Sequence, residues 1–476
     1  MAGRNVLIIM SDEHLRGATG CYGGAVHTPH LDRLSSLGAR FTQAVTPSSI
    51  CVPAHASLVT GHYVHKTGFW SNAQPYDGSV KGWGHRLIDE GHRVVSVGKL
   101  HYRSAEDDNG FDQVIAPLPV KDGIRWARGL LGRDGSAWGK AAHFAEAIGP
   151  GLCDYNTYDM RVCKEARRWL KTDAPAAGEK PWVLYVSFVS PHNRLIVPRR
   201  HYDLYPLDRL QPPRLNTASQ APRHPVVQAV RRYMNYDDYF DDHGRLVAKA
   251  SYLGLCSFLD DQIGQVLAAL DDSGQYDDTL ILYASDHSDL VGNHGMWTKC
   301  VMFEESAAIP MLAAGPGIPT GVVIDEPVSL IDVHPTVLEA VGLGLTDDDM
   351  ALPGRSLLCI AGGARHGRTL LSEYHDGGSV TGMFMIRHGR WKYTAYPGFA
   401  PELYDLEADP FEAHDLGESA RHADVRAACD ARLRTVVDPE SANERCFAEQ
   451  ARRIAELGGR DAILAREDFD QSPVPA

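Results

Sequence analysis

Residues 48–61 read Ser-Ser-Ile-Cys-Val-Pro-Ala-His-Ala-Ser-Leu-Val-Thr-Gly, and the rest of the chain is organised around them. Cys51 stands two residues before Pro53, at the entry to a short apolar run that ends in Thr-Gly. This pattern predicts a loop that turns into a helix close to Cys51. Backbone N–H groups at the start of a helix favour an anion, so Cys51 is a candidate nucleophile. A lone cysteine is nevertheless more often an ordinary buried residue, and the residues around it decide between the two.

The composition is that of an ordinary globular protein with an acidic balance. The chain has 476 residues, of which 44% are hydrophobic and 23% charged, and its formal net charge is −14. This length predicts two domains, or one large domain with an appendage. The absence of a basic block argues against nucleic-acid binding. A small anionic substrate is compatible with the acidic chain, because the charge inside a cleft can oppose the net charge.

The N-terminal apolar run at 5–10 is too short for a targeting signal, and it leads directly into Ser11-Asp12-Glu13-His14. No apolar run is long enough to span a membrane. The nine cysteines are scattered and include no C-x-x-C pair, a pattern typical of a reducing compartment. We therefore expect a cytoplasmic protein with no membrane partner.

Short apolar runs that end in polar residues alternate with helical patterns along the chain. We predict buried strands at 5–10, 93–98, 182–188 and 279–284, and helices at 28–38, 82–90 and 252–270. This alternation indicates an α/β fold with a large, mostly parallel sheet flanked by helices.

The pattern changes after about residue 365. A hairpin is predicted at 381–396 around His388-Gly389, and a charged helix at 422–436. We therefore expect a catalytic α/β domain at 1–365 and a smaller antiparallel subdomain with a helix and a terminal arm at 366–476. Residues 195–245 show little periodicity and are predicted to form a long loop over the active face.

Reactive side chains follow each of the four predicted strands, at the edge where open α/β sheets bind ligands. They are Asp12, Glu13, Lys99, His101, His192, Asp286 and His287, with Lys299 shortly afterwards. Singly, each has an ordinary explanation as a helix cap, a turn residue or a loop histidine. Together, their oxygens and imidazole suit a divalent cation, namely Ca²⁺, Mg²⁺ or Mn²⁺, or Zn²⁺ through the histidine. A metal, lysines and a nucleophile at a helix start fit sulfuryl or phosphoryl transfer.

Motifs spread over nearly the whole chain carry a resemblance to a known family. They are Thr28-Pro-His-Leu-Asp-Arg-Leu, Cys51-Val-Pro-Ala-His with Leu58-Val-Thr-Gly, Gly98-Lys-Leu-His, Ser285-Asp-His, Gly292-Asn-His-Gly, and Leu403-Tyr-Asp-Leu with Asp409-Pro and Glu412. Together they resemble the type I sulfatases of the alkaline phosphatase superfamily, whose signature is C-x-P-x-R followed by L-x-T-G. Ser190-Pro-His, Asp286-His and Phe303-Glu-Glu-Ser are similar to the branch of choline sulfatases and phosphonate monoester hydrolases.

The resemblance implies an alkaline phosphatase-like fold, a homo-oligomer (dimer or tetramer), and a set of residue roles. In sulfatases the signature cysteine is oxidised to formylglycine, whose hydrated form attacks sulfur or phosphorus, so Cys51 takes the role of nucleophile. His192 would protonate the leaving alcohol, and His101 would deprotonate the intermediate. Lys99 and Lys299 would stabilise the oxyanion, and Asn72 would contact the substrate. The implied metal ligands, with Ca²⁺ as the expected ion, are Asp12, Glu13, Cys51, Asp286 and His287.

One position departs from the family pattern: His55 stands where the signature has arginine. In the family that arginine helps the modifying enzyme to recognise its target and braces the formylglycine, and we expect His55 to take its place at the substrate. Two forms of position 51 therefore stay open. It is a formylglycine made by a formylglycine-generating enzyme as partner, or a thiolate beside the metal whose intermediate water must release.

The leading hypothesis is a metal-dependent hydrolase of small anionic sulfate esters that works through a covalent sulfo-enzyme intermediate. The alternative is a hydrolase of phosphonate monoesters or phosphodiesters on the same site. A third hypothesis is a catalytically silent binding homologue that lost activity through the change at His55. Trp70, Tyr76 and the segment 195–245 are candidates to line the substrate pocket.

Overall fold

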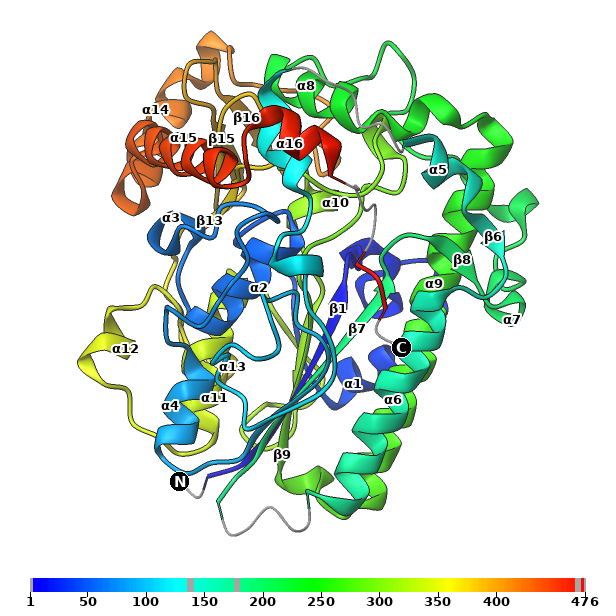
Figure 1. The fold of residues 1–476 in the computed structure, drawn as a ribbon, viewed down its shortest axis with the longest axis vertical. Coiled ribbons are helices and arrows are strands. Elements are labelled where there is room, and N and C mark those ends of the chain that lie inside the picture. Colours follow the sequence, from blue (N-terminus) through cyan, green and yellow to red (C-terminus); the bar gives the residue numbers. More distant parts are fainter. Residues whose placement is uncertain (1–2, 135–140, 175–179, 467–471, 475–476) are drawn as a thin grey trace.

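The computed structural model describes residues 3–134, 141–174, 180–466 and 472–474. Figure 1 shows a central sheet between two layers of helices, with a second, smaller sheet and its helices packed at one end. No helix within these described ranges combines the length and apolar character needed to cross a membrane.

The central sheet has eight strands in the order β11-β2-β10-β9-β1-β7-β4-β5. Their bounds are β1 Asn5–Asp12, β2 Gly38–Phe41, β4 Val94–Lys99, β5 Gln113–Leu118, β7 Val183–Pro191, β9 Thr279–Ser285, β10 Met311–Ala314 and β11 Val322–Ile324. β10 is antiparallel to both of its neighbours, and every other pair is parallel. The predicted mostly parallel sheet is confirmed.

Strand β1 lies in the middle of the sheet because its side chains are apolar on both faces. Val6, Ile8 and Met10 belong to the core on one side of the sheet. Leu7 and Ile9 belong to the core on the other side, as the alternation of a strand requires. A slip of β1 by one residue would exchange its two sets of side chains between cores that are packed to fit them, so its polar end, Asp12, has a fixed position.

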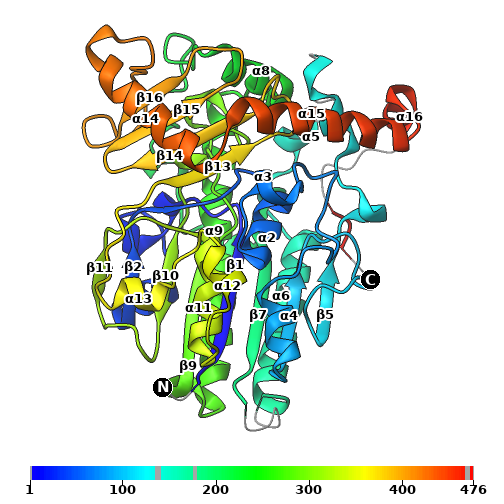
Figure 2. The same cartoon turned by 90° about the vertical axis from the view of Figure 1, so that its left-hand side faces the viewer.

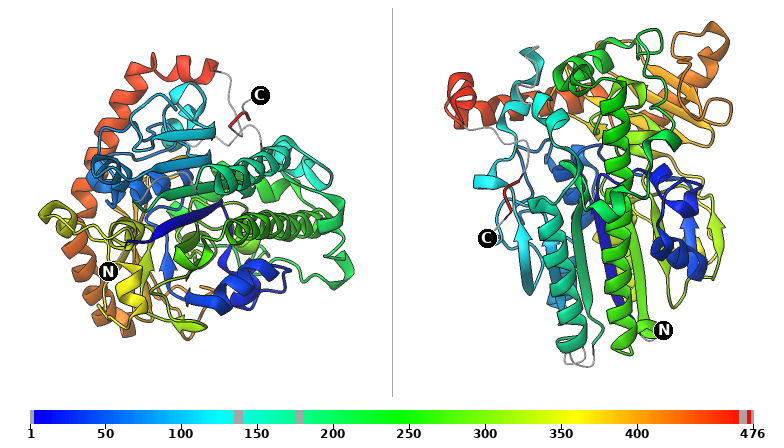
Figure 3. Two further views of the ribbon diagram at one scale, coloured as in Figure 1. Left: turned by 90° about the horizontal axis from the view of Figure 1, so that it is seen from below. Right: turned by 90° about the vertical axis from the view of Figure 1, so that its right-hand side faces the viewer.

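Helices cover both faces of the sheet (Figures 2 and 3). The first face carries α2 Cys51–Thr60, α4 Trp83–Asp89 and α11 Val333–Ala340. The second face carries α1 Pro29–Leu37, α6 Asp154–Thr172 and the long α9 Asp242–Asp272. α6 and α9 run side by side along this face, as the right-hand view of Figure 3 shows.

The smaller sheet is antiparallel, with the order β13-β14-β15-β16. Its strands are β13 Leu370–Tyr374, β14 Met383–His388, β15 Trp391–Ala395 and β16 Glu402–Asp405. The predicted hairpin is confirmed as β14 and β15, joined through Gly389, whose φ of 57° suits a residue without a Cβ. Helix α14 Ala423–Val436 packs on this sheet through Leu433, and α15 Pro439–Glu456 follows it.

Segment 195–245 is not the long loop that its sequence suggested. It contains β8 Leu195–Val197, α7 Arg199–Tyr202, α8 Pro225–Met234 and the first residues of α9. Val226, Val227, Val230 and Met234 recur at helical spacing and are buried, so the signal for α8 was present within the polar surroundings. Helices α6 and α15 were also not predicted.

Short elements complete the fold. They are β3 Ala44–Val45, β6 Ile148–Pro150, β12 Val328–Ser329, α3 Val64–Thr67, α5 Ala141–Glu146, α10 Glu304–Ala307, α12 Asp347–Ala351, α13 Leu357–Ala361 and α16 Arg460–Ala465.

Candidate active site

The reactive residues meet at one edge of the central sheet. β1 ends at Asp12, β4 at Lys99, and β9 directly before Asp286. These three strands are parallel within the sheet, so their carboxyl ends lie together. Helix α2 begins at Cys51, as predicted, and its first turn faces this edge.

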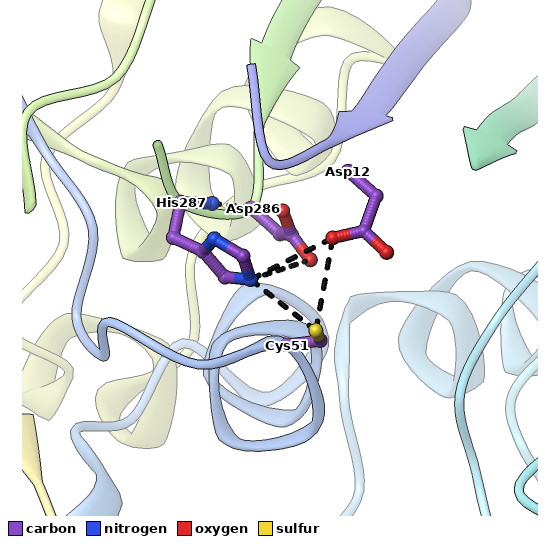
Figure 4. Close-up of side chains that lie close together, drawn as sticks. All are labelled: Asp12, Cys51, Asp286 and His287. Atoms are coloured by element: carbon purple, nitrogen blue, oxygen red, sulfur yellow. Dashed lines mark hydrogen bonds and ion pairs between the residues drawn. The ribbon is translucent and has the colours of Figure 1, made fainter. Parts of the chain in front are cut away.

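Three buried groups converge around the Cys51 thiol (Figure 4): Asp12, Asp286 and His287. The Cys51 Sγ lies 3.7 Å from Asp12 Oδ1 and 3.2 Å from His287 Nε2. One ligand atom from each of Asp12, Cys51, Asp286 and His287 lies within 4.8 Å of the others. Burial and the nearby Asp12 carboxylate raise the pKa of the Cys51 thiol to about 12 and outweigh the opposing effect of two lysines.

Two lysines lie against the carboxylates. Lys99 Nζ is 2.5 Å from Asp12 Oδ2 and 3.3 Å from Asp286 Oδ2, and all three side chains are buried. Burial alone would lower the pKa of Lys99, but the two carboxylates raise it above its ordinary value. Lys299 Nζ lies 2.8 Å from Glu13 Oε2. Both ammonium groups are therefore charged next to Cys51.

Glu13 is held close to the other carboxylates by an unusual backbone conformation. Its φ is 70°, in the left-handed region, and its carbonyl oxygen accepts a hydrogen bond from the Tyr252 hydroxyl at 2.6 Å. Its Oε1 is buried and has no hydrogen-bond partner in the described ranges, and burial raises the pKa of Glu13 to about 8. An unpartnered carboxylate oxygen beside two further carboxylates and an imidazole fits a divalent cation.

His192 and His101 are neutral and lie close to these groups. Burial and Lys299 lower the pKa of His192 well below its ordinary value, and burial and Lys99 do the same for His101. His192 Nδ1 is 2.7 Å from the carbonyl oxygen of Asn193. This contact places the ring proton on Nδ1 and leaves Nε2, which is 3.4 Å from Glu13 Oε2, as the free nitrogen.

His55 lies one turn of α2 beyond Cys51 and contacts the ligand group rather than the open pocket. Its Nε2 is 3.4 Å from Asp286 Oδ2, and its Nδ1 is 3.2 Å from the Tyr185 hydroxyl. The residue is 1% exposed. It braces the Asp286 carboxylate, and it is not among the residues that line the pocket.

A pocket opens at the start of α2, next to Ile50, which directly precedes Cys51, and it is lined by polar groups and by apolar walls. Its polar residues include Asn72, Arg125, His192 and Lys299, and its apolar residues include Trp126, Met234 and Tyr236. Segment 195–245 therefore contributes to the pocket. Trp70 and Tyr76 are fully buried in the core and do not line it, contrary to expectation.

Asn72 lies between helix α2 and the pocket. Its Oδ1 accepts the N–H of Val52 in the first turn of α2 at 3.2 Å, which satisfies one of the free donors of that turn. Its own N–H donates to Asp376 at 2.7 Å. Asn72 also lines the pocket, where its side-chain amide can meet a substrate.

Three residues of this region were missed by sequence reasoning: Arg125, Asp159 and Asp376. Asp159, on α6, accepts the N–H groups of Val189 and Ser190, both at 2.8 Å, directly before His192. Burial raises the pKa of Asp159 to about 6 and that of Asp376 to about 7. None of the three stands in a motif or after a predicted strand, so no sequence signal distinguished them.

Comparison with known families identifies the family of this chain. The model of the sulfatase family matches residues 4–343, and the model of the N-sulphoglucosamine sulphohydrolase C-terminal region matches residues 292–438. The chain belongs to the sulfatase family.

Relatives of this sulfatase align over most of its length. Choline-sulfatase of Rhizobium meliloti is 31% identical over 431 residues, which cover 88% of this chain and 83% of the relative. Arylsulfatase K of Danio rerio is 29% identical and covers 92% of this chain and 85% of its own. The phosphonate monoester hydrolase of Agrobacterium radiobacter has the same fold, with a TM-score of 0.75, 23% identity, and coverage of 91% of this chain and 95% of that one. This sulfatase is a hydrolase with the alkaline phosphatase-like architecture, as expected.

Proposed function

We propose that this sulfatase hydrolyses small anionic sulfate esters through a covalent sulfo-enzyme intermediate on residue 51. One observation carries the proposal: Cys51 begins α2 with its Sγ 3.2 Å from His287 Nε2 and 3.7 Å from Asp12 Oδ1. A nucleophile at a helix start, among metal-type ligands and buried lysines, suits attack on an anionic tetrahedral centre. A thiol placed only for packing would not gather such groups.

The group of Asp12, Cys51, Asp286 and His287 would hold one divalent metal ion, and Glu13, which is grouped with Asp12 and His192, is a further candidate ligand. Ca²⁺ is the expected ion, with Mn²⁺, Mg²⁺ and Zn²⁺ as alternatives. When bound, such an ion supplies Lewis-acid polarisation of an ester oxygen.

The protein groups divide the proton transfers between two histidines. The attacking hydroxyl of a hydrated formylglycine gives its proton to His192 Nε2, the free ring nitrogen, and its oxygen bonds to sulfur while the bond from sulfur to the alcohol oxygen breaks. His192 Nε2 then passes that proton to the leaving alcohol. His101 then takes the proton of the second hydroxyl, the bond from carbon to the sulfate oxygen breaks, and the aldehyde returns as sulfate leaves. Lys99 and Lys299 donate to the sulfate oxygens that face them.

Position 51 has two candidate forms, and each makes a distinct prediction. Formylglycine requires a formylglycine-generating enzyme as partner, although His55 replaces the signature arginine. An unmodified Cys51 would instead form a thiosulfate linkage that water must cleave. Peptide mass spectrometry across residue 51 distinguishes the aldehyde from the thiol directly.

The name of the Rhizobium meliloti relative implies a choline ester as its substrate. The pocket of this chain does not favour such a substrate. The described residues that line the pocket include Arg125 and Lys299 and no carboxylate. The aromatic faces of Trp126 and Tyr236 could contact a quaternary ammonium group, but the cationic Arg125 and Lys299 in the same pocket would repel it. We therefore propose an anionic leaving group rather than a cationic one.

Parallel assays test the proposal against its alternatives. Metal-loaded protein is given an aryl sulfate, an aryl phosphonate monoester and a bis-aryl phosphate, with Cys51→Ala as control. We expect the sulfate to be turned over with the highest kcat/KM and the control to be inactive. Phosphorus esters that react much faster would favour the phosphonate or phosphodiester hydrolase. No turnover, with ligand binding unchanged in Cys51→Ala, would favour a silent binding homologue.

We also propose a reducing, cytoplasmic location and a homo-oligomeric state. All nine cysteines are free, and Cys359 is exposed, which suits a reducing compartment. Size-exclusion chromatography with light scattering measures the oligomeric state.

A further inference from the structure

Arg125 is a buried cation on the wall of the substrate pocket. It follows β5 along the chain and is 8% exposed. It lines the pocket together with Asn72, His192 and Lys299. Its position is therefore accessible to a bound substrate but largely removed from bulk water.

The guanidinium has no anionic partner among the described residues. Its Nη1 lies 2.9 and 2.8 Å from the two ring nitrogens of His101, and no carboxylate in the described part of the chain forms an ion pair with it. A neutral imidazole cannot act as a counter-ion. By contrast, the other two cations of the site are paired: Lys99 with Asp12, and Lys299 with Glu13.

A buried charge without a partner is costly, and proteins keep one where a ligand supplies the partner. Arginine offers five N–H donors in a planar fork, which matches a carboxylate or a sulfate with two parallel hydrogen bonds. Among the described residues, side chains engage only Nη1 of this fork. The remaining donors are available to an oxyanion in the pocket.

The pocket around Arg125 suits a leaving group that contains a ring. Trp126, Met234 and Tyr236 provide apolar surfaces beside the cationic groups. An aromatic or sugar ring can pack on such walls while charged substituents reach the polar groups. Lys299 contacts Glu13. In the proposed function the reacting ester binds close to this lysine.

We propose that Arg125 binds a second anionic group, a carboxylate or a second sulfate, on the leaving alcohol of the substrate. This inference rests on the proposed function and names the class of its substrate: ring-containing sulfate esters with a further negative charge. Arg125 is then a specificity-determining residue that acts on binding.

The test uses pairs of aryl sulfates that carry a carboxylate or a neutral carboxamide at the same ring position, with ortho, meta and para members. A third arm carries a second sulfate in place of the carboxylate. For at least one ring position, wild-type protein should prefer the charged member through a lower KM. Arg125→Gln should lose at least about tenfold in kcat/KM on that member, as expected for a hydrogen-bonded charge, and stay close to wild type on the carboxamide.

Two matched variants control for charge and stability. Arg125→Lys should retain part of the preference because it keeps the charge but not the fork. Arg199→Gln, which removes an exposed arginine on α7 whose side chain is 72% exposed, should leave the preference unchanged. Equal melting temperatures of Arg125→Gln and wild type show that the variant is folded.

Three results overturn the inference. The first is that wild-type protein does not distinguish the two members of any pair. The second is that Arg125→Gln loses kcat/KM equally on both members, which means that Arg125 holds the reacting sulfate itself. The third is that Arg199→Gln loses the preference as well. Failure of the proposed function is a separate outcome, because no aryl sulfate of any kind is then hydrolysed. In that case, calorimetric binding of the carboxylated and carboxamide phenols to wild type and Arg125→Gln still decides whether Arg125 selects an anion.

Discussion

Replacing Lys99 by methionine should lower both the stability and the activity of this sulfatase. A bound metal ion should then restore much of the stability but not the activity. Lys99 Nζ lies between Asp12 and Asp286, at 2.5 and 3.3 Å, and is completely buried. Removing one partner of a buried ion pair costs about 3–5 kcal/mol, because the remaining charge stays buried without compensation. Without metal, we expect Lys99→Met to lose a free energy of unfolding of this size.

A divalent ion at the same carboxylates should restore much of this loss. Ligand binding stabilises the folded state by about 2.7 kcal/mol at a concentration of 100 times Kd. Methionine removes a cation that opposes metal binding, and each tenfold gain in metal affinity adds about 1.4 kcal/mol. The metal-dependent gain in stability should therefore be larger in Lys99→Met than in wild type. Activity should not recover, since the loss of one donor to the reacting anion lowers kcat by about 10²–10³.

Lys392 is a matched control in the smaller sheet. It is 1% exposed and lies 3.3 Å from Glu304 Oε1 and 2.8 Å from Glu412 Oε1. Lys392→Met should lose similar stability without metal, should gain no more from metal than wild type, and should keep kcat/KM. The assays are equilibrium urea unfolding with and without saturating Ca²⁺ or Mn²⁺, and steady-state kinetics on an aryl sulfate. The reasoning fails if both variants gain equally from metal, or if Lys99→Met without metal is as stable as wild type.

Three further changes test other parts of the site. Asp159→Ala removes the acceptor of two backbone N–H groups that lie just before His192. In urea unfolding it should lower the free energy of unfolding by about 1–3 kcal/mol per unsatisfied group. It should also lower kcat in steady-state kinetics, and an unchanged kcat would contradict a role of Asp159 in positioning His192. Asp376 keeps its proton in the folded state up to pH about 7 but releases it near pH 4 when unfolded. Wild-type stability therefore falls as pH rises between these values, and Asp376→Asn should escape this loss. In urea unfolding, the free energy of unfolding of Asp376→Asn relative to wild type should be higher at pH 8 than at pH 5, and an equal value at both pH values would refute this. His55→Arg restores the family signature, and peptide mass spectrometry after co-production with a formylglycine-generating enzyme should show more aldehyde at position 51 than in wild type; an equal fraction would contradict this.

Local patterns predicted the parts of the site that depend on neighbouring residues in the chain. The apolar run before Asp12 predicted a buried strand because a chain buried on both faces needs continuous hydrophobicity. The turn into α2 at Cys51 followed from the proline and the apolar residues behind it. The same logic misjudged residues 195–245, where buried valines at helical spacing were outweighed by the polar residues around them. The helix α8 that they form brings Met234 to the pocket.

The sequence by itself determined the family, the strand ends that bear Asp12, Lys99 and Asp286, and the start of α2, since parallel strands place their carboxyl ends together whatever the loops do. Only the tertiary structure decided which side chains face one another across those ends. It brought Arg125 to the pocket, with no counter-ion in the part of the chain that the structure describes, and put His55 behind Asp286. Burial and charge pairing arise from contacts between distant segments, and no local periodicity encodes them.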